Sequence, residues 1–422
     1  MGSRKAHKLA WEAFYHQIEG FWPDLYGTEY ALYDYYMLAE EETKKIYTAA
    51  TRVGHIFRKT SELLRQLPDE TLQLLGFRRE SIPFLRVKLF PFESVIARLD
   101  LAFIDGNYKL LELNADTPTF IRETFDINER VARHFQMISP NEDAEKWLSM
   151  KIRKAIKLGL ESIGRDQEPH IVFTSHDDHL EDKETVLYLK RIAGLDSSYV
   201  PLHELRIVEQ NTRTMKRGLY DSEGRKIDLL YRQTYPLEFL LNDQSPDGFD
   251  VGIFLLQLWK DRQLAILNPP SAFLLQSKAV QALIWGIHEE KSSFYSEEEH
   301  RWISQYFLPT YLDEDFFIKQ QKTYVQKPAF GREGDSVLIK GNNGSVLHSN
   351  NEQTYAEEVQ VYQQFVPLSK TVVKTLHGPE TVNLLYTCFL INGEAMGVGL
   401  RAGGLITNNL SYFLPVVMQK KG

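Results

Sequence analysis

The strongest constraint on the fold is a pair of strands that the sequence predicts within residues 94–114. Residues 94–104 are mostly apolar and typical of a strand, and residues 108–114 are typical of a returning strand. Between them, Asp105-Gly106-Asn107 is a turn signal. We therefore predict a β-hairpin here, and the polar residues on its two strands are the first candidates for function.

Two polar pairs lie on this predicted hairpin. Arg98 and Asp100 are two residues apart on the first strand, and Glu112 and Asn114 are two apart on the second, so each pair shares one face. If the turn is a three-residue loop that ends at a left-handed Asn107, Asp100 lies directly opposite Glu112. A two-residue loop would instead put the two pairs on opposite faces of the hairpin.

Facing carboxylates would favour a metal site. Two carboxylates on neighbouring strands, roughly 5 Å apart at Cβ, repel each other unless a cation bridges them or one is protonated. Oxygen ligands suit magnesium, which also takes phosphate oxygens, and Arg98 is suited to grip a phosphate. The alternative is a surface strand on which Arg98 and Asp100 are merely solvated, or on which an arginine pairs with a glutamate.

A second candidate site follows a predicted strand at residues 323–328. Lys327 precedes Pro-Ala-Phe-Gly-Arg-Glu-Gly-Asp-Ser, a loop that could lay backbone N–H groups and basic side chains over phosphates. It matches neither the Walker pattern, which needs Gly-Lys followed by Ser or Thr, nor the spacing of a dinucleotide fingerprint. Two glycines in a loop are more often an ordinary turn.

Periodicity along the rest of the chain predicts a mixed α+β or α/β architecture in four segments. Residues 1–92 are expected to be mostly helical, with an aromatic stripe from Trp11 to Trp22 that is typical of packing and a second run from Tyr30 to Leu64. Residues 93–165 hold the hairpin and two helices, at 119–135 and 142–163. Residues 166–270 alternate strands and helices, which favours a partly parallel sheet, and residues 271–422 hold a helix at 277–290 and a terminal hairpin around Asn392-Gly393.

Charge and cysteine content narrow the function classes. The 422 residues carry 49 Lys and Arg against 57 Asp and Glu, a formal net charge of −8, which argues against a nucleic-acid-binding surface. The single cysteine, Cys388, lies in an apolar run, so we predict a buried thiol, no disulfide or zinc cluster, and a cytoplasmic protein. No stretch approaches the roughly 20 apolar residues of a membrane span, so no membrane partner is expected.

Several motifs resemble those of the glutathionylspermidine synthase family, in its synthetase part. They occur in family order from residue 20 onward, and Glu-Leu-Asn-Ala-Asp-Thr-Pro-Thr at residues 112–119 is the most specific. The resemblance implies an ATP-grasp-like fold with a pre-ATP-grasp α/β unit at residues 166–270, and a ligase that joins an acid and an amine with ATP and Mg²⁺. The other matching motifs are Ala-Arg-Leu-Asp at 97–100, Tyr-Pro-Leu-Glu at 235–238, Lys-Pro-Ala-Phe-Gly-Arg-Glu-Gly at 327–334, Tyr-Gln-Gln at 362–364, Gly-Leu-Arg at 399–401 and Leu-Ile-Thr-Asn-Asn at 405–409.

The resemblance also implies roles for particular residues. On the hairpin, Asp100, Glu112 and Asn114 would hold magnesium, and Arg98 would steady the transferred phosphate. The remaining implied roles are nucleotide binding by Lys278, Lys327, Gln364 and the closing loop with Gly331, Arg332 and Gly334, charge stabilisation during acyl transfer by Arg401, and binding of a peptide-like acid by Asp116, Thr117, Thr119 and Glu238.

Two departures from the family pattern affect the predicted activity. The best-known member carries an additional N-terminal amidase domain with a catalytic cysteine, whereas the only cysteine here is near the other end, so we expect a bond-making enzyme without an amidase. After Arg401 the family usually has an acidic residue, whereas Ala402 follows here. Two alternatives are therefore open: a nucleotide-binding relative without ligase activity, regulatory or scaffolding, and an enzyme that phosphorylates a small molecule without an acceptor amine. The acidic surface mildly favours a cationic amine, such as a polyamine or an amino acid.

Overall fold

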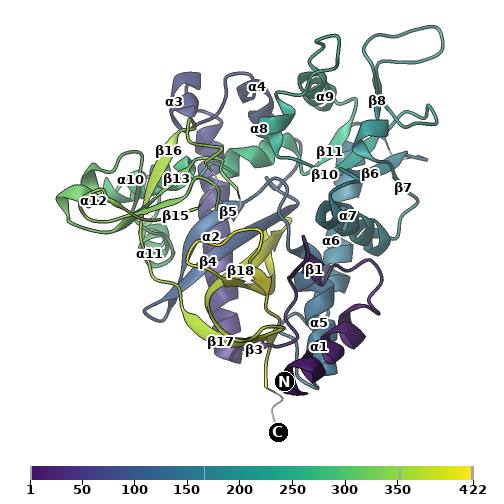
Figure 1. Cartoon of the computed structure of the whole chain (residues 1–422). Coiled ribbons are helices and arrows are strands. Elements are labelled where there is room, and N and C mark those ends of the chain that lie inside the picture. The colour runs from purple at the N-terminus through teal and green to yellow at the C-terminus, as the bar shows by residue number, and fades with distance from the viewer. Residues whose placement is uncertain (1, 166, 333, 351–352, 420–422) are drawn as a thin grey trace.

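The computed structural model describes residues 2–165, 167–332, 334–350 and 353–419 (Figure 1). Its N-terminal part combines helices with three short strands, and β1 and β2 form a small antiparallel ladder. The elements are α1 (Gly2–Tyr15), β1 (Asp24–Leu25), β2 (Thr28–Glu29), β3 (Tyr36–Met37), α2 (Glu40–Leu64), α3 (Asp69–Leu74) and α4 (Ile82–Leu85).

Residues 16–39 are not helical, which corrects the prediction for this segment. The aromatic stripe is buried as predicted, but α1 ends at Tyr15, and the second run becomes helical only at Glu40. Tyr26 and Gly27 take positive φ angles (52° and 76°) in the turn between β1 and β2, a conformation that a helix does not allow. Helix α2 begins where the Glu42 carboxylate accepts the backbone N–H of Ala39 (2.9 Å) and acidic side chains favour the helix N-terminus.

The central sheet joins strands from distant parts of the chain. Its order is β20-β19-β18-β4-β5, with β17 also paired to β18 and all pairs antiparallel. The strands are β4 (Ile96–Ile104), β5 (Asn107–Asn114), β17 (Lys370–Thr375), β18 (Gly378–Ile391), β19 (Glu394–Gly403) and β20 (Tyr412–Phe413). The β18–β19 hairpin turns at residues 392 and 393, as predicted.

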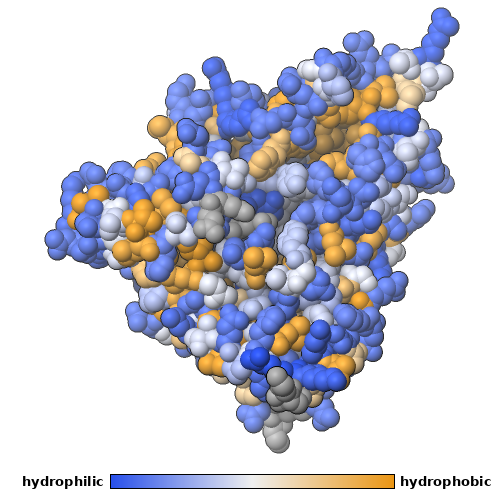
Figure 2. Space-filling view, viewed as in Figure 1, coloured by the Kyte–Doolittle hydropathy of each residue, from blue (hydrophilic) through white to orange (hydrophobic). Residues whose placement is uncertain are grey.

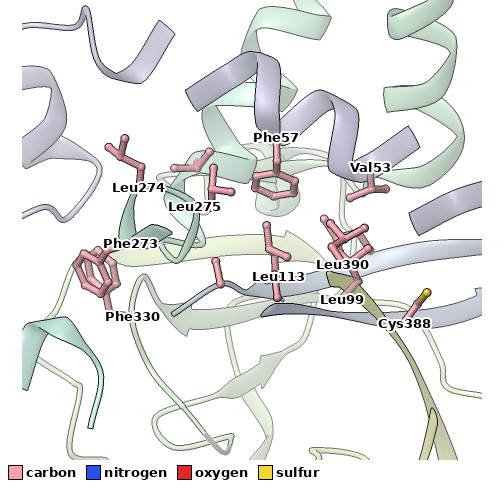
Figure 3. Packing of buried hydrophobic residues seen from close by; sticks show 14 of the residues in the cluster. Val53, Phe57, Leu99, Leu113, Phe273, Leu274, Leu275, Phe330, Cys388 and Leu390 are labelled. Atoms are coloured by element: carbon pink, nitrogen blue, oxygen red, sulfur yellow. The ribbon is translucent and has the colours of Figure 1, made fainter. Parts of the chain in front are cut away.

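Helix α2 covers one face of this sheet. Figure 3 shows Val53 and Phe57 pointing from α2 toward Leu99, Leu113 and Leu390 of β4, β5 and β18. All five side chains are buried, and burying side chains of this size contributes about 1.5–3 kcal/mol each. Because side chains alternate along a strand, the polar pairs of β4 and β5 lie on the opposite face of the sheet.

A parallel sheet lies beside the central sheet (Figure 1). Its order is β11-β10-β6-β7, which confirms the partly parallel sheet predicted for this region. The elements of the region are η1, a π-helical turn (Glu123–Ile127), α5 (Asn128–His134), α6 (Ala144–Ser162), β6 (Ile171–Ser175), α7 (Leu180–Ala193), β7 (Ser198–Tyr199), the 3₁₀ helix η2 (Leu202–Glu204), β8 (Arg206–Val208), β9 (Gly218–Tyr220), β10 (Leu229–Gln233), α8 (Leu237–Leu240), α9 (Val251–Lys260) and β11 (Ala265–Leu267). The helix predicted from residue 119 therefore begins later and contains a π-helical turn.

The third layer is an antiparallel sheet of order β12-β16-β13-β14-β15, on the left in Figure 1. Its region comprises η3, a 3₁₀ helix (Pro270–Leu275), α10 (Ala279–Glu289), α11 (Glu297–Tyr306), β12 (Thr310–Tyr311), α12 (Asp315–Lys319), β13 (Tyr324–Pro328), β14 (Leu338–Lys340), β15 (Val346–Ser349) and β16 (Gln360–Gln364). Near the chain end, β21 (Val416–Val417) pairs in parallel with β3. The four-segment division of the chain stays a prediction.

The surface and the single thiol also bear on the predictions. Hydrophilic side chains predominate on the face shown in Figure 2, and apolar ones appear in scattered groups. None of the described helices is both long enough and apolar enough to cross a membrane. Cys388 is buried and free, as predicted, and burial raises the pKa of its thiol.

Candidate active site

The β4–β5 hairpin brings the two polar pairs together by a route that the sequence did not predict. Ile104 pairs with Asn107, so the turn has two residues, with Asp105 and Gly106 at φ angles of 48° and 78°. Alone, this turn would put the pairs on opposite faces. A β-bulge follows, however, because Leu111 has no partner between the Asp100–Glu112 and Leu101–Leu110 pairs. Of the two turn alternatives, the structure has the two-residue one, and the bulge nevertheless places Asp100 opposite Glu112.

Arg98 and Asp100 form a buried ion pair. The guanidinium donates to both carboxylate oxygens, from Nε to Oδ1 at 2.7 Å and from Nη2 to Oδ2 at 2.9 Å, and its Nη1 donates to the backbone oxygen of Thr119 at 3.1 Å. Burial alone would lower the pKa of Arg98, but Asp100 raises it above its ordinary value. The arginine therefore stays charged, and it pairs along its own strand and not with a glutamate.

Glu112 lies among cations. Its Oε1 accepts a hydrogen bond from Asn114 Nδ2 (3.2 Å), and its Oε2 lies 3.3 Å from Lys278 Nζ. Burial would raise the pKa of the Glu112 carboxyl, but Lys278 and Lys327 hold it well below its ordinary value. The carboxylate is ionised, and 28% of the Glu112 side chain is exposed.

Two lysines approach this carboxylate from the start of α10 and from β13. Lys278, immediately before α10, also donates to the backbone oxygen of Gly331 (2.7 Å). Lys327, on β13, donates to the backbone oxygen of Leu111 (2.9 Å) and to Gln363 Oε1 (2.8 Å). Burial lowers the pKa of Lys327 to about 7, although Glu112 opposes this shift. Both lysines thus lie close to Glu112 with little solvent around them.

Two cavities meet at the facing carboxylates. One is polar and is lined by Tyr30, Arg98, Asp100, Glu112, Asn114, Thr117, Pro118, Thr119, Phe120, Glu181, Gln276, Arg332, Gly334, Leu385, Arg401, Thr407 and Asn409. The other is mostly apolar and is lined by Asp100, Leu111, Glu112, Lys278, Val325, Lys327, Pro328, Gly331, Gly334, Val337, Ile339, Gln363, Gln364, Phe365, Val366, Leu368, Leu385, Leu405, Ile406 and Thr407. Asp100 and Glu112 line both, so the facing carboxylates lie at the junction of the two cavities.

Most of the residues predicted for the site line one of these cavities, but Asp116 and Glu238 do not. Both carboxylate oxygens of Asp116 are bonded within the protein, one to Arg232 and one to the backbone N–H of Leu237 (2.9 Å). The carboxyl oxygens of Glu238 are buried and have no hydrogen-bond partner among the described residues. Burial, with a smaller contribution from Asp116, raises the pKa of Glu238 to about 8. Contact of either residue with a substrate stays a prediction.

The loop after β13 packs against residues 406 and 407, which follow β19. Phe330 anchors it by stacking on Phe273, with ring centroids 4.6 Å apart (Figure 3). Gly334 has a φ of +73°, and a Cβ there would lie 2.6 Å from the backbone oxygen of Thr407, so only glycine fits. The Asp335 carboxylate and the Ser336 hydroxyl accept the backbone N–H groups of residues 354 and 355 (3.0 and 2.9 Å). Residue 333, within the predicted phosphate loop, lies outside the described residues.

Arg401 and Gln364 each line one of the two cavities, and their implied roles stay predictions. Arg401, on β19, lines the polar cavity and donates from Nη2 to the backbone oxygen of Asn408 (2.7 Å). Gln364 lines the apolar cavity, but its neighbour Gln363 is the residue that bonds Lys327. Gln363 lines the same apolar cavity.

Sequence reasoning missed several residues of the polar cavity. Tyr30 lines it and donates to the fully buried carboxylate of Glu123 (2.5 Å), which lies on the π-helical turn. Gln276 lines it as well, and its Oε1 accepts the backbone N–H groups of Ala115 (2.7 Å) and Asp116 (3.2 Å). No local pattern indicates Tyr30, and only proximity to Lys278 in the sequence could have indicated Gln276.

The donor set fits magnesium only when further oxygen ligands are present. Two carboxylates and an amide oxygen are typical magnesium ligands. Among the described residues, no group of three or more His, Cys, Asp or Glu side chains is suited to a metal. The surrounding cations, Arg98, Lys278 and Lys327, are suited to phosphate oxygens. The arrangement therefore fits a magnesium–polyphosphate complex better than a metal ion alone.

Comparison with known proteins agrees with this architecture. A Haemophilus influenzae protein, whose name describes it as a proposed acid–amine ligase, is 24% identical over 323 residues, which cover 75% of this chain and 73% of that protein. The structure of a glutathione synthetase-like effector from Globodera pallida superposes with a TM-score of 0.59 at 12% identity, covering 98% of this chain and 96% of that one. This likeness shows the predicted ATP-grasp-like fold. The family model described as "Glutathionylspermidine synthase preATP-grasp" matches residues 4–419, and the chain therefore belongs to that family.

Proposed function

We propose that this protein is an ATP- and Mg²⁺-dependent carboxylate–amine ligase that forms an amide bond through an acyl phosphate. The observation that carries the proposal is the meeting of an apolar and a polar cavity at Asp100 and Glu112. The apolar cavity suits an adenine ring, and the polar one suits a carboxylic acid. The family and the name of the Haemophilus influenzae relative support the same class of reaction.

Each group of residues has a part in this proposal. Lys278, Lys327 and the loop around Gly334 bind the phosphates, and Asp100, Glu112 and Asn114 would hold the metal. When bound, magnesium would neutralise charge on the phosphoryl group in flight. Arg98 steadies the transferred γ-phosphate and the acyl phosphate formed from it, and stabilises the developing charge. The contact between the loop and Thr407 excludes water, which would otherwise hydrolyse the acyl phosphate.

The amide-forming step takes place on the polar side. The amine attacks the acyl carbon, the C–N bond forms as the C–O bond to phosphate breaks, and phosphate leaves with the electron pair of that bond. The proton lost by the amine passes to the departing phosphate or to solvent. Arg401 and Arg332 line this cavity and are available to stabilise the leaving phosphate. We propose a peptide-like acid, bound near Thr117 and Thr119, and an amine such as a polyamine or an amino acid. No nucleic-acid or membrane partner is proposed, and a cytoplasmic site of action stays a prediction from the single cysteine.

Isotope transfer tests the proposal. The protein is incubated with Mg-ATP, a panel of ¹⁸O-carboxyl-labelled peptides, and polyamines or amino acids, and ADP, phosphate and amide are measured. The proposal expects ADP formation to require an acid, and ¹⁸O to pass from that acid to phosphate. If ATP binds but no acid supports turnover, a nucleotide-binding relative without ligase activity is the better account, as the Ala402 departure also allows. If a phosphorylated product accumulates whether or not an amine is present, the protein is a kinase.

A further inference from the structure

The candidate metal site carries its own counter-ions. Asp100 accepts two N–H groups from Arg98, at 2.7 and 2.9 Å. Glu112 accepts one from Asn114 and lies 3.3 Å from the ammonium of Lys278. Arg98, Asp100 and Lys278 are almost fully buried, so solvent screens these attractions poorly. In this arrangement, neither carboxylate is free to act as a metal ligand on its own.

The charge balance disfavours a lone divalent ion. The two carboxylates contribute −2 and the guanidinium and the Lys278 ammonium contribute +2, so the pair of ion pairs is neutral. Lys327, bonded to the backbone of Leu111, adds further positive charge whenever it is protonated. A metal ion would have to give up bound water, which magnesium does reluctantly, and then meet Lys278 at close range. Glu181 also lines the polar cavity, but no group of three or more His, Cys, Asp or Glu side chains in the described part of the chain is placed to hold a metal ion.

A bound polyphosphate makes the charge balance favourable for a divalent ion. ATP brings about four negative charges at neutral pH, and phosphate oxygens are good acceptors for both a lysine and an arginine. Lys278 already reaches the phosphate loop, through its bond to Gly331 (2.7 Å), and it lines the same cavity as Lys327. A short rotation of the Lys278 side chain can therefore exchange Glu112 for a phosphate. That exchange releases the carboxylate to the metal and supplies further oxygen ligands.

We propose that Lys278 and Arg98 act as resident counter-ions that keep the hairpin site closed to divalent metal until a polyphosphate draws them away. The metal then binds only together with the nucleotide, and Lys278 is the residue that contributes most to this coupling. This inference rests on the proposed nucleotide site and adds how its loading is controlled. By linkage, the nucleotide strengthens metal binding by the same factor as the metal strengthens nucleotide binding.

The test measures binding of Mn²⁺, used in place of Mg²⁺, to the protein without nucleotide. Free hydrated Mn²⁺ is followed by its electron paramagnetic resonance signal while protein is titrated in without nucleotide. Wild type should leave the signal nearly unchanged. Lys278→Met should bind Mn²⁺ about tenfold more tightly, equivalent to about 1.4 kcal/mol, and adding Glu112→Gln to that variant should remove the gain. Lys319→Met is the matched control, because it removes the same charge from an exposed lysine on α12.

Two outcomes would overturn the inference. One is uptake of one equivalent of Mn²⁺ by nucleotide-free wild type that Glu112→Gln abolishes. The other is a folded Lys278→Met protein, checked by circular dichroism, that binds Mn²⁺ no better than Lys319→Met. If Lys278→Met does not fold, the wild-type comparison with Glu112→Gln decides the matter. Calorimetry with ATP, in EDTA and in Mn²⁺, distinguishes failure of the nucleotide site from failure of the coupling. If ATP binds under neither condition, the proposed nucleotide site is wrong as well. If ATP binds and Mn²⁺ also binds without nucleotide, only the proposed coupling is wrong.

Discussion

Replacing Asn268 by alanine should loosen the open end of the β4–β5 hairpin, which carries the candidate metal ligands. The Asn268 carboxamide oxygen accepts the backbone N–H groups of Val95 (2.8 Å) and Ile96 (3.1 Å). Its Nδ2 reaches the carbonyl oxygens of Ile96 (2.9 Å), Ala115 (3.2 Å) and Asp116. One buried side chain thus ties the residues where β4 begins to those just after β5.

The magnitude follows from the groups left behind. Two buried backbone N–H groups would lose their acceptor, at about 1–3 kcal/mol each, and three carbonyl oxygens would lose a donor. Water entering the space left by the carboxamide offsets part of this cost, so we expect a local destabilisation of about 3 kcal/mol. That free energy corresponds to about a 100-fold loss of amide protection in the hairpin.

Hydrogen exchange read by mass spectrometry is the suitable assay, because a chain of this size is not expected to unfold in a single two-state step. Peptides covering residues 94–116 should exchange faster in Asn268→Ala, and faster than peptides from the β13–β16 sheet. Asn242→Ala is the control, since it removes an exposed carboxamide that bonds Arg78 at the surface. If protection of the hairpin peptides falls less than threefold, or falls equally in the control, Asn268 does not hold the hairpin as we argue.

Three further predictions concern pH and the phosphate loop. Burial would raise the pKa of the Glu299 carboxyl, but hydrogen bonds from Lys59, the Ser296 N–H and His55 lower it to about 2. The Glu299 carboxylate therefore contributes about 2–3 kcal/mol to the stability of the fold above pH 4.5. This contribution is lost as the pH falls toward 2. Wild type should therefore lose more thermal stability than Glu299→Gln between pH 5 and pH 3, and parallel losses would contradict this. Burial lowers the pKa of Lys327 to about 7, so this lysine is largely neutral at pH 8 and must take up a proton to pair with a phosphate. ATP binding should therefore take up more protons at pH 8 than at pH 6, which calorimetry in buffers of different ionisation enthalpy can show. Lys327→Met should abolish the difference. Gly334→Ala should weaken ATP binding at least tenfold, whereas Gly344→Ala, with a similar φ (+79°) but no close contact, should not; equal effects would mean that backbone strain and not the clash with Thr407 is responsible.

In the β4–β5 hairpin, the strands and their polar faces could be predicted from the sequence, but the turn and the bulge could not. Spacing identified the strands and the facing carboxylates, because alternation along a strand is strict. From spacing alone, the facing pairs require a three-residue turn, whereas the structure combines facing pairs with the two-residue alternative. A bulge at Leu111 restores the register, and bulges depend on neighbouring strands and not on a local residue pattern.

Apart from Lys327 and the loop after it, the rest of the site depended on the family resemblance. Lys278 and Lys327 reach Glu112 only because distant elements pack together, and their spacing in the sequence carries no sign of it. Tyr30 lies in a segment that was predicted to be helical, so its place in the polar cavity could not be foreseen. The Arg98–Asp100 ion pair was within reach of sequence reasoning, since the two residues share a face, but an arginine paired with a glutamate was considered instead.

The central claim is that the junction of the two cavities binds Mg-ATP through Glu112, and a thermal-shift titration tests it most directly. Mg-ATP is titrated into wild type and into Glu112→Gln, and the melting midpoint is recorded at each concentration. We predict that the wild-type midpoint rises with nucleotide as mass action requires, and that Glu112→Gln needs at least tenfold more nucleotide for the same rise. No shift of the wild type at saturating Mg-ATP, or equal shifts of the two proteins, would contradict the account.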